Sequence, residues 1–249
     1  MGKLQGRTVV ITGGASGIGL ATARRFVDEG AFVYLFGRRQ EALDAALAEL
    51  GDNARAIRGD VANLDDLDRL FSAVKAERGG LDVLFANAGV GWLVPLGAIT
   101  PEDYERTFGT NVKGTIFTVQ RALDVLKPGS AIILTGSTTG STGTEAFSVY
   151  SASKAAVRNL ARSWALDLKG RGIRVNVLTP GPTETLTVKA LLEETGKGEE
   201  LAAKLLGDVP LGRWGDPAET AGVAAFLASD DSRFMTGSEV FVDGGHAQV

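Results

Sequence analysis

The residues with the clearest chemical potential are a tyrosine and a lysine four positions apart, Tyr150 and Lys154. Alanines and apolar residues follow at three- and four-residue spacing, which predicts a helix from position 150 through position 164. On such a helix the phenol and the ammonium lie on one face. A free phenol has a pKa of about 10, and a nearby cation is expected to lower it toward the range of an acid–base catalyst. The pair alone is weak evidence, because this spacing also occurs between ordinary surface residues.

Composition excludes several other kinds of chemistry. The 249-residue chain has no cysteine, so disulfides, thiolate nucleophiles and cysteine-ligated zinc are excluded. Its single histidine, His246, argues against a Ser-His-Asp triad and against a multi-histidine site, so no metal is expected. The formal net charge of -4 gives no reason to expect nucleic acid or an anionic membrane surface as a partner.

A cytoplasmic location is expected from the absence of targeting and membrane signals. Residues 1–6 lead directly into a predicted strand, which leaves no room for a signal peptide. No apolar run is long enough to span a bilayer, so no membrane partner is expected.

Strand-like apolar runs alternate with helical patterns along the whole chain. The expected strands are residues 7–11, 31–36, 54–58, 81–85, 131–135, 172–178 and 239–243. The expected helices are residues 20–29, 40–50, 64–77, 101–126, 150–164, 183–206 with an interruption at 196–198, and 217–228. No repeat or linker interrupts the pattern, so residues 1–249 are taken as a single domain. This alternation predicts an α/β fold with a doubly wound parallel sheet of about seven strands and helices on both faces.

A glycine-rich turn, residues 12–19, joins the first strand to the first helix. Glycines let the backbone approach a ligand closely, and a helix N-terminus presents free N–H groups to an anion. The glycine spacing is not that of the G-x-G-x-x-G fingerprint, but the strand before and the helix after it favour a dinucleotide over a bare turn. The cofactor candidates in this turn are Gly13, Ser16, Gly17, Ile18 and Gly19.

The second strand is followed by Gly37, Arg38 and Arg39, with no carboxylate. An acidic residue here would accept a hydrogen bond from the adenosine ribose 2′-OH of NAD, whereas a guanidinium suits the 2′-phosphate of NADP. The sequence therefore favours NADP (NADPH) over NAD. The alternative is that both arginines simply begin the surface helix at residue 40.

Polar residues also follow the third and fourth strands. Asp60 and Asn87 lie at strand ends, where open α/β sheets hold ligands, although Asp and Asn in loops are more usually turn formers. Farther along, the predicted helix 101–126 has Thr100 as its N-cap but contains Gly109, Thr110, Asn111 and Gly114, which are poor interior residues. Either the helix bends there for packing, or Asn111 is retained for its polar group.

Residues 183–206 are read as a lid over the substrate, since long excursions in compact domains are usually functional. Apolar residues near the site favour a hydrophobic or aryl compound over a sugar as substrate, although the same residues could form core. The residues expected to shape the pocket are Val90, Trp92, Val94, Thr138, residues 143–147, Leu186, Val188, Leu191 and Leu192.

The ordered set of motifs resembles the short-chain dehydrogenase/reductase family, of the compact single-domain kind with a Rossmann-type sheet. The resemblance covers essentially the whole chain, through residues 242–245. The motifs that carry it, in chain order, are residues 12–19, Asp60-Val61, Asn87-Ala88-Gly89, Asn111, Ser137, Tyr150 with Lys154, and Pro180-Gly181. Each motif is weak alone, but the set in this order and approximate spacing is specific.

The resemblance implies roles for these residues. Ser137, Tyr150 and Lys154 would form the catalytic triad, with Asn111 as a fourth member that holds a water linking Lys154 to solvent. Asp60 and Val61 would lie by the adenine; Asn87, Ala88 and Gly89 would line the adenosine side; Pro180, Gly181 and Thr185 would touch the nicotinamide half or the diphosphate. Tyr150 and Lys154 would also contact the cofactor. A homotetramer is expected, with the last strand and the preceding helix at an interface.

Three positions depart from the family pattern. Ala86 stands where an asparagine is common, and Thr183 stands where an aliphatic residue is usual, with its backbone N–H expected to keep the contact. Ser16 stands where many NADP-using relatives carry a basic residue, so the NADP preference depends on Arg38, with Arg39 in support.

The resemblance implies interconversion of a carbonyl compound and an alcohol by hydride transfer, with Tyr150 as proton donor or acceptor. Two other readings remain: a non-redox relative without nucleotide binding, and an NADP sensor without turnover. The intact turn at residues 12–19 argues against the first, and the presence of Ser137, Tyr150 and Lys154 together argues against the second.

Overall fold

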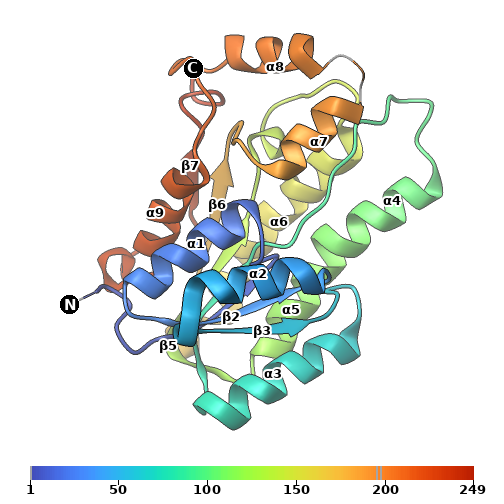
Figure 1. Ribbon diagram of the computed structural model, residues 1–249. Coiled ribbons are helices and arrows are strands. Elements are labelled where there is room, and N and C mark those ends of the chain that lie inside the picture. Colours follow the sequence, from blue (N-terminus) through green and yellow to red (C-terminus); the bar gives the residue numbers. More distant parts are fainter. Residues whose placement is uncertain (1, 195, 197) are drawn as a thin grey trace.

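A seven-stranded, all-parallel sheet forms the centre of the computed structural model, which describes residues 2–194, 196 and 198–249 but not the side chains at 187, 191 and 194 (Figure 1). The strand order is β3-β2-β1-β4-β5-β6-β7. The strands are β1 Thr8–Thr12, β2 Phe32–Gly37, β3 Ala54–Arg58, β4 Leu81–Ala86, β5 Leu126–Thr135, β6 Arg174–Pro180 and β7 Glu239–Val242. The predicted doubly wound sheet is confirmed.

Helices cover both faces of the sheet, and two hydrophobic cores result. The helices are α1 Gly17–Asp28, α2 Gln40–Leu50, α3 Leu64–Arg78, α4 Pro101–Phe108, α5 Thr115–Ala122, α6 Ser148–Asp167, α7 Leu186–Glu194, α8 Gly198–Gly207 and α9 Pro217–Ala228. Short 3-10 turns are Gly51–Asn53, Thr138–Gly140, Lys169–Arg171 and Asp230–Ser232. One core lies between the sheet and α3, α5 and α6, and the other between the sheet and α1, α2 and α9.

The strand order reverses between β1 and β4. The chain winds from β1 through β2 to β3, and β4 then returns to pair with the opposite edge of β1. Loops leaving the carboxyl ends of β1 and β4 diverge at this point, which is where open α/β sheets form a ligand crevice. Helices α7 and α8 lie apart from the two helical layers, at the top of Figure 1.

Local sequence signals explain the best-predicted helix ends. Helix α4 begins after a capping box in which Thr100 and Asp103 exchange hydrogen bonds, and α9 begins after the same arrangement of Asp216 and Glu219. Each box satisfies N–H groups that the first turn leaves free. The predicted bounds of α2, β3 and α9 are confirmed.

Two predicted helices are wrong in extent. The helix expected over residues 101–126 consists of α4, a π-helical turn Gly109–Gly114 and α5, and it ends at Ala122. Leu126 instead begins β5, because the N–H of Leu81 bonds to the carbonyl of Val125 at 2.7 Å and draws this segment beside β4. Thr183 also lies outside a helix: it forms a β-bridge with Gly215, and α7 begins at Leu186.

None of the helices in the described part of the chain combines the length and apolar character needed to cross a membrane.

Candidate active site

The turn between β1 and α1 depends on its glycines. Gly13 and Gly17 have φ angles of 64° and 53°, in the left-handed region that residues with a Cβ avoid. A Cβ at Gly19 would overlap the carbonyl oxygen of Gly13. Ser16 makes no side-chain cap at the N-terminus of α1. The first turn therefore presents its free N–H groups beside a close backbone approach, which suits a phosphate.

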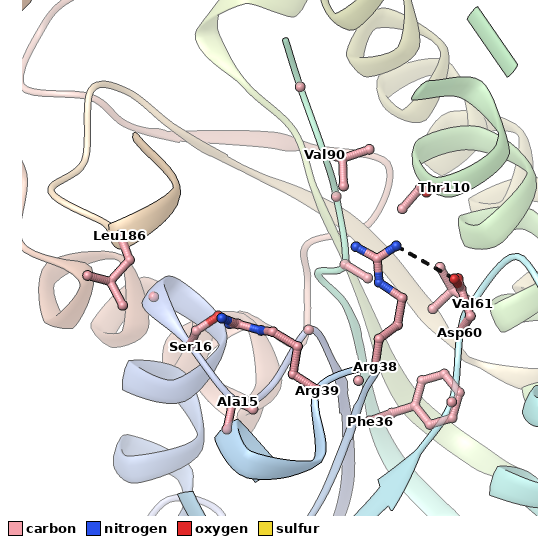
Figure 2. A pocket seen from close by; sticks show the side chains of 18 of the residues that line it. Ala15, Ser16, Phe36, Arg38, Arg39, Asp60, Val61, Val90, Thr110 and Leu186 are labelled. Carbon is pink, nitrogen blue, oxygen red and sulfur yellow. Dashed lines mark ion pairs between the residues drawn. The ribbon is translucent and has the colours of Figure 1, made fainter. Parts of the chain in front are cut away.

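A cleft of about 510 Å³ opens above this turn, at the carboxyl ends of β1, β2 and β4 (Figure 2). Its volume lies in the range of small-molecule sites. Predicted cofactor residues that line it are Gly13, Ser16, Gly17, Gly37, Arg38, Arg39, Asp60, Val61, Ala88 and Gly89. The predicted substrate-pocket residues Val90, Trp92 and Leu186 also line it, together with Ala15, Phe36, Ala42, Gly59, Gly91, Thr110 and Ala190, which were not predicted.

Positive charge is concentrated at the β2 end of this cleft. Arg38 forms an ion pair with Asp60, at 3.7 Å between Nη1 and Oδ2, and its side chain is 63% exposed. Figure 2 shows the Arg38 and Arg39 side chains extending in different directions from neighbouring backbone positions. An exposed guanidinium in a cleft can turn toward an anionic group without breaking a buried contact. The residues thus fit a dinucleotide carrying a phosphate at this end.

Asn87 supports the turn and does not line the cleft. Its Nδ2 donates to the carbonyls of Thr12 at 3.1 Å and Gly13 at 3.3 Å. Thr12 Oγ1 in turn accepts the N–H groups of Asn87 and Ala88, both at 3.0 Å. The sequence placed Asn87 at the correct strand end but did not single out Thr12, whose role depends on a strand pairing 75 residues away in sequence.

The remaining cofactor candidates lie beside the cleft. Ile18 and Gly19 are in the first turn of α1, with Gly19 buried. A Cβ at Gly181 would lie 2.6 Å from Cα of Asp243, so the chain after β7 packs directly on this glycine. Thr183 is buried, and its Oγ1 donates to the Gly181 carbonyl at 2.9 Å. Pro180 ends β6, whereas Thr185 approaches the glycine turn, with Cγ2 3.3 Å from a Cβ built at Gly17.

Tyr150 and Lys154 occupy the first turns of α6 and face the same region, as predicted. Lys154 is only 4% exposed, and its Nζ donates to the carbonyl of Thr135 at the end of β5, at 2.9 Å. The same Nζ lies 5.6 Å from the centroid of the Tyr150 ring. A Cβ at Gly89 would be 3.3 Å from this Nζ, and Gly89 lines the cleft. The catalytic candidates therefore adjoin the glycine turn's cleft.

Burial dominates the acid–base properties of this pair. It lowers the pKa of Lys154 to about 8, because the ammonium loses water that one carbonyl does not replace. Burial also raises the pKa of Tyr150 above its ordinary value, while the hydrogen bond with Ser137 acts in the opposite direction. The expectation that Lys154 lowers the pKa of Tyr150 is therefore corrected: burial raises this pKa, and the group that opposes the rise is Ser137.

Ser137 follows β5 and begins a short 3-10 turn. Its Oγ accepts the N–H of Thr139 at 3.3 Å and lies 3.0 Å from Thr139 Oγ1. These contacts orient the Ser137 side chain, which also forms the hydrogen bond with Tyr150. Thr139 is a supporting residue that the sequence did not reveal.

Asn111 lies in the π-helical turn, and its side chain is buried and fully engaged. Oδ1 accepts the N–H of Val90 at 2.8 Å, while Nδ2 donates to the Val90 carbonyl at 2.8 Å and to Ser153 Oγ at 3.0 Å. Ser153 Oγ donates to the carbonyl of Tyr150 at 2.6 Å. Asn111 thus connects α6 to the loop after β4, which resolves the question of bend or polar group in favour of the polar group. Ser153 was not predicted.

One hydrogen-bonded chain crosses three strands and joins the two halves of the site. Asn87 holds the Gly13 carbonyl at the β1 end and accepts a hydrogen bond from Thr135 Oγ1 at 3.2 Å. Thr135 ends β5, and its carbonyl accepts from Lys154. The glycine turn and the buried lysine are therefore linked through two intervening side chains, and this link was not predicted.

The loop after β4, which carries Trp92 and Val94, is anchored by a cation–π contact and a backbone hydrogen bond. The Arg106 guanidinium lies 3.4 Å from the Trp92 ring centroid, in a cation–π contact. The N–H of Val94 bonds to the carbonyl of Ala146 at 2.6 Å. From the predicted lid, Leu186 is largely exposed and lines the cleft with Ala190, whereas the side chain of Leu191 lies outside the described residues.

In the described part of the chain, no three histidine, cysteine, aspartate or glutamate side chains gather as metal ligands would.

Comparison with known proteins gives consistent relatives. Residues 13–247 match the family profile described as enoyl-(acyl carrier protein) reductase. The chain is 58% identical over 249 residues to oxidoreductase asL5 of Sarocladium schorii, covering 99% of this chain and 98% of that protein. It is 35% identical over 252 residues to galactitol 2-dehydrogenase of Agrobacterium fabrum, covering 98% of each. A crystal structure of a short-chain dehydrogenase/reductase, glucose/ribitol dehydrogenase, from Brucella melitensis superimposes with a TM-score of 0.92 at 32% identity, covering 100% of both chains.

Proposed function

The chain belongs to the short-chain dehydrogenase/reductase family, and on that premise we propose that it interconverts a ketone or aldehyde and an alcohol with NADP(H). Its relatives are oxidoreductases that include alcohol dehydrogenases, and oxidoreductase chemistry is what this family shares. The proposal adds the cofactor preference and the assignment of Tyr150 as proton donor and acceptor.

One observation carries the proposal: Tyr150, Lys154 and Ser137 meet beside the cleft at the glycine turn. Lys154 Nζ lies 5.6 Å from the centre of the Tyr150 ring, and the Ser137 hydroxyl acts to lower the pKa of Tyr150. A buried ammonium, a phenol and a hydroxyl would serve little purpose in a core, since burying polar groups costs stability. Their meeting at a cleft lined by Gly89 supports the proposal that a bound dinucleotide would end beside them.

The protein groups supply the proton chemistry of the reaction. When bound, the nicotinamide supplies the hydride. Tyr150 gives its proton to the substrate oxygen, and Ser137 donates a hydrogen bond to the same oxygen as negative charge develops there. Lys154, mostly protonated at neutral pH given its pKa of about 8, stabilises the phenolate that remains. In the alcohol-to-carbonyl direction, Tyr150 takes the proton as a base.

Burial raises the pKa of Tyr150, so the phenol is protonated near neutral pH and can act as the proton donor. We propose net carbonyl reduction in the cell because NADP pools usually run in the reducing direction.

The cofactor preference depends on the cations at the β2 end of the cleft. Arg38 and Arg39 line this end, and no carboxylate follows β2 where an NAD-binding site would carry one. Asp60 also lines the cleft, but Arg38 forms an ion pair with it. These features support NADP, and they place NAD second.

Apolar groups support a hydrophobic or aryl carbonyl compound as substrate. Trp92, Val90 and Leu186 line the cleft, and Phe147 lies against Tyr150. A rim of this kind binds apolar surface and offers few partners to a polyol.

Assembly and location are proposed from the family. We expect a homotetramer in the cytoplasm, with β7 and α9 at one interface. Phe234, in the turn before β7, is fully exposed, and Leu166 of α6 is also largely exposed. Analytical ultracentrifugation of the full chain tests the assembly: four copies are expected, and a monomer would contradict it.

The direct test is NADPH and NADH oxidation with a panel of aliphatic, aryl and sugar carbonyl compounds. Turnover with NADPH and an apolar carbonyl compound is expected. Fluorescence titration with NADPH separates the alternatives: binding without turnover indicates a sensor, and absence of binding indicates a non-redox relative.

A further inference from the structure

Phe147 lies against the ring of Tyr150 at the start of α6. The ring centroids are 4.4 Å apart and the planes are inclined by 25°, which is a stacked arrangement. Phe147 immediately precedes the helix and Tyr150 lies three positions later, so helical spacing brings the two rings to one face. The proton transfer described above makes no use of Phe147.

The backbone before Phe147 is strained. Ala146 has a φ of 57°, and it is the one non-glycine residue in the described part of the chain with a positive φ. The left-handed conformation is unfavourable for a residue with a Cβ. The carbonyl of Ala146 accepts the N–H of Val94 at 2.6 Å, which ties this residue to the loop after β4. The loop after β4 therefore holds Ala146 in its strained conformation, and this conformation sets the position from which the Phe147 side chain extends.

Gly91 lies against the rings of Tyr150 and Phe147 from a second side. A Cβ at Gly91 would lie 2.7 Å from Cδ2 of Tyr150 and 3.2 Å from Cζ of Phe147. Both rings therefore meet the same stretch of backbone, and Gly91 also lines the cleft. The ring of Tyr150 is bounded by Phe147 on a flat face and by Gly91 at its edge.

We propose that Phe147 is a positioning residue that fixes the plane of the Tyr150 ring and keeps water from one of its faces. The proposal rests on the function proposed above, in which Tyr150 transfers the proton. A ring held in one plane keeps its hydroxyl directed at the substrate oxygen, and misplacement by 1 Å can cost about a hundredfold in rate. Exclusion of water also contributes to the burial that raises the pKa of Tyr150.

The chain offers a matched control for this contact. Tyr104 and Phe108 of α4 form a second stacked pair, with centroids 4.6 Å apart and the same 25° inclination. Phe108→Ala removes a ring from a tyrosine outside the cleft, whereas Phe147→Ala removes the ring from Tyr150. Phe147→Leu keeps apolar bulk and provides the readout if the alanine variant does not fold.

Two measurements test the proposal. The first is kcat and KM with NADPH, where Phe147→Ala should lower kcat about tenfold or more with the KM for NADPH within about twofold. The second is NMR titration of the three tyrosines, carbon-13 labelled at Cζ, without cofactor. The Tyr150 signal, assigned with Tyr150→Phe, should titrate at a lower pH in Phe147→Ala. Phe147→Leu should show smaller changes, and Phe108→Ala should leave the Tyr150 signal unchanged.

The outcomes separate this proposal from the general one. An inactive wild-type protein contradicts the proposed function, and the NMR titration then still decides whether Phe147 controls the surroundings of Tyr150. An active wild-type protein whose Phe147 variants keep both kcat and the Tyr150 titration overturns the positioning role. Equal losses in Phe147→Ala and Phe108→Ala would also overturn it, because the effect would then be general destabilisation.

Discussion

The two halves of the site differ in the groups that form them: backbone groups in one and side chains in the other. The half around the β1–α1 turn is made of backbone, with left-handed glycines, an N-terminus without a side-chain cap and an exposed Arg38. The half around α6 is made of side chains, with a buried Lys154 and a Tyr150 ring that contacts Phe147. Backbone can surround a phosphate with little loss of solvation, whereas a buried ammonium loses its water.

This difference predicts different responses to mutation. At the glycines of the backbone half, adding atoms should do the damage, because space is what the glycines provide; Arg38 differs, because its side chain supplies charge. In the side-chain half, removing atoms should destroy catalysis and yet relieve a folding cost. The four experiments below test this contrast, from the largest expected effect to the smallest.

Tyr150→Phe should show the largest effect. It removes only the phenolic oxygen, so kcat should fall about a thousandfold, within the range of general acid–base catalysis. The affinity for NADPH, measured by fluorescence titration, should change little because the glycine half is untouched. Near-normal activity would remove Tyr150 from the mechanism.

Gly19→Ala should weaken NADPH binding about a hundredfold, because the added methyl overlaps the Gly13 carbonyl and displaces the turn. Thermal stability should fall as well, by about 1–3 kcal/mol for an overpacked position. Gly222→Ala in α9 is the control, since a Cβ there meets no atom within 4 Å. If both alanine variants bind NADPH like wild type, the close approach at Gly19 is unimportant.

Arg38→Ala should raise the KM for NADPH about 10- to 100-fold, as expected for loss of charge-assisted hydrogen bonds to a phosphate. The KM for NADH should change far less, because that cofactor carries no 2′-phosphate. Arg39→Ala should show the same selectivity to a smaller extent. Equal changes for both cofactors in Arg38→Ala would refute the NADP assignment.

Lys154→Met should stabilise the fold by a small amount, although it removes a residue assigned to catalysis. The lysine pKa falls from 10.5 to about 8 on folding, so below pH 8 the buried charge costs roughly 3 kcal/mol. Losing the bond to Thr135 offsets about 1 kcal/mol, which leaves the variant about 2 kcal/mol more stable at pH 7. Urea unfolding without cofactor measures this difference.

The same difference should depend on pH in a defined direction. Above pH 8 the folded wild-type protein releases the Lys154 proton while the unfolded chain keeps it, so wild-type stability rises relative to Lys154→Met. The gap between the two proteins should therefore shrink between about pH 8 and 10.5. A difference in stability that stays constant across this range would show that folding does not lower the pKa of Lys154.

Features set by local signals could be predicted from the sequence. Proline after a capping aspartate placed α9, and the seven strands followed from apolar runs between turns. The helix expected to reach position 126 was wrong because its end is set by pairing of β5 with β4. Local patterns do not report such distant partners.

The same distinction between local and distant determinants applies to the residues of the site. The glycine turn and the Tyr150–Lys154 face could be predicted, since both depend on short spacing. The supporting roles of Thr12 and Ser153 could not, because each depends on a contact with a segment placed by the fold. The shift in the pKa of Tyr150 was predicted in the wrong direction. Burial raises this pKa, and burial depends on the fold, so a neighbouring lysine in the sequence does not reveal it.

The chain of hydrogen bonds from Gly13 through Asn87 and Thr135 to Lys154 has a thermodynamic consequence. We expect a ligand that moves the Gly13 carbonyl to shift Asn87 and Thr135 as well, and so to change the affinity of Lys154 for its proton. Linkage is reciprocal, so acidity must then change the affinity of that ligand by the same free energy. Nucleotide affinity that varies between pH 7 and 9, and loses this variation when Asn87 is replaced by alanine, would reveal communication across the sheet.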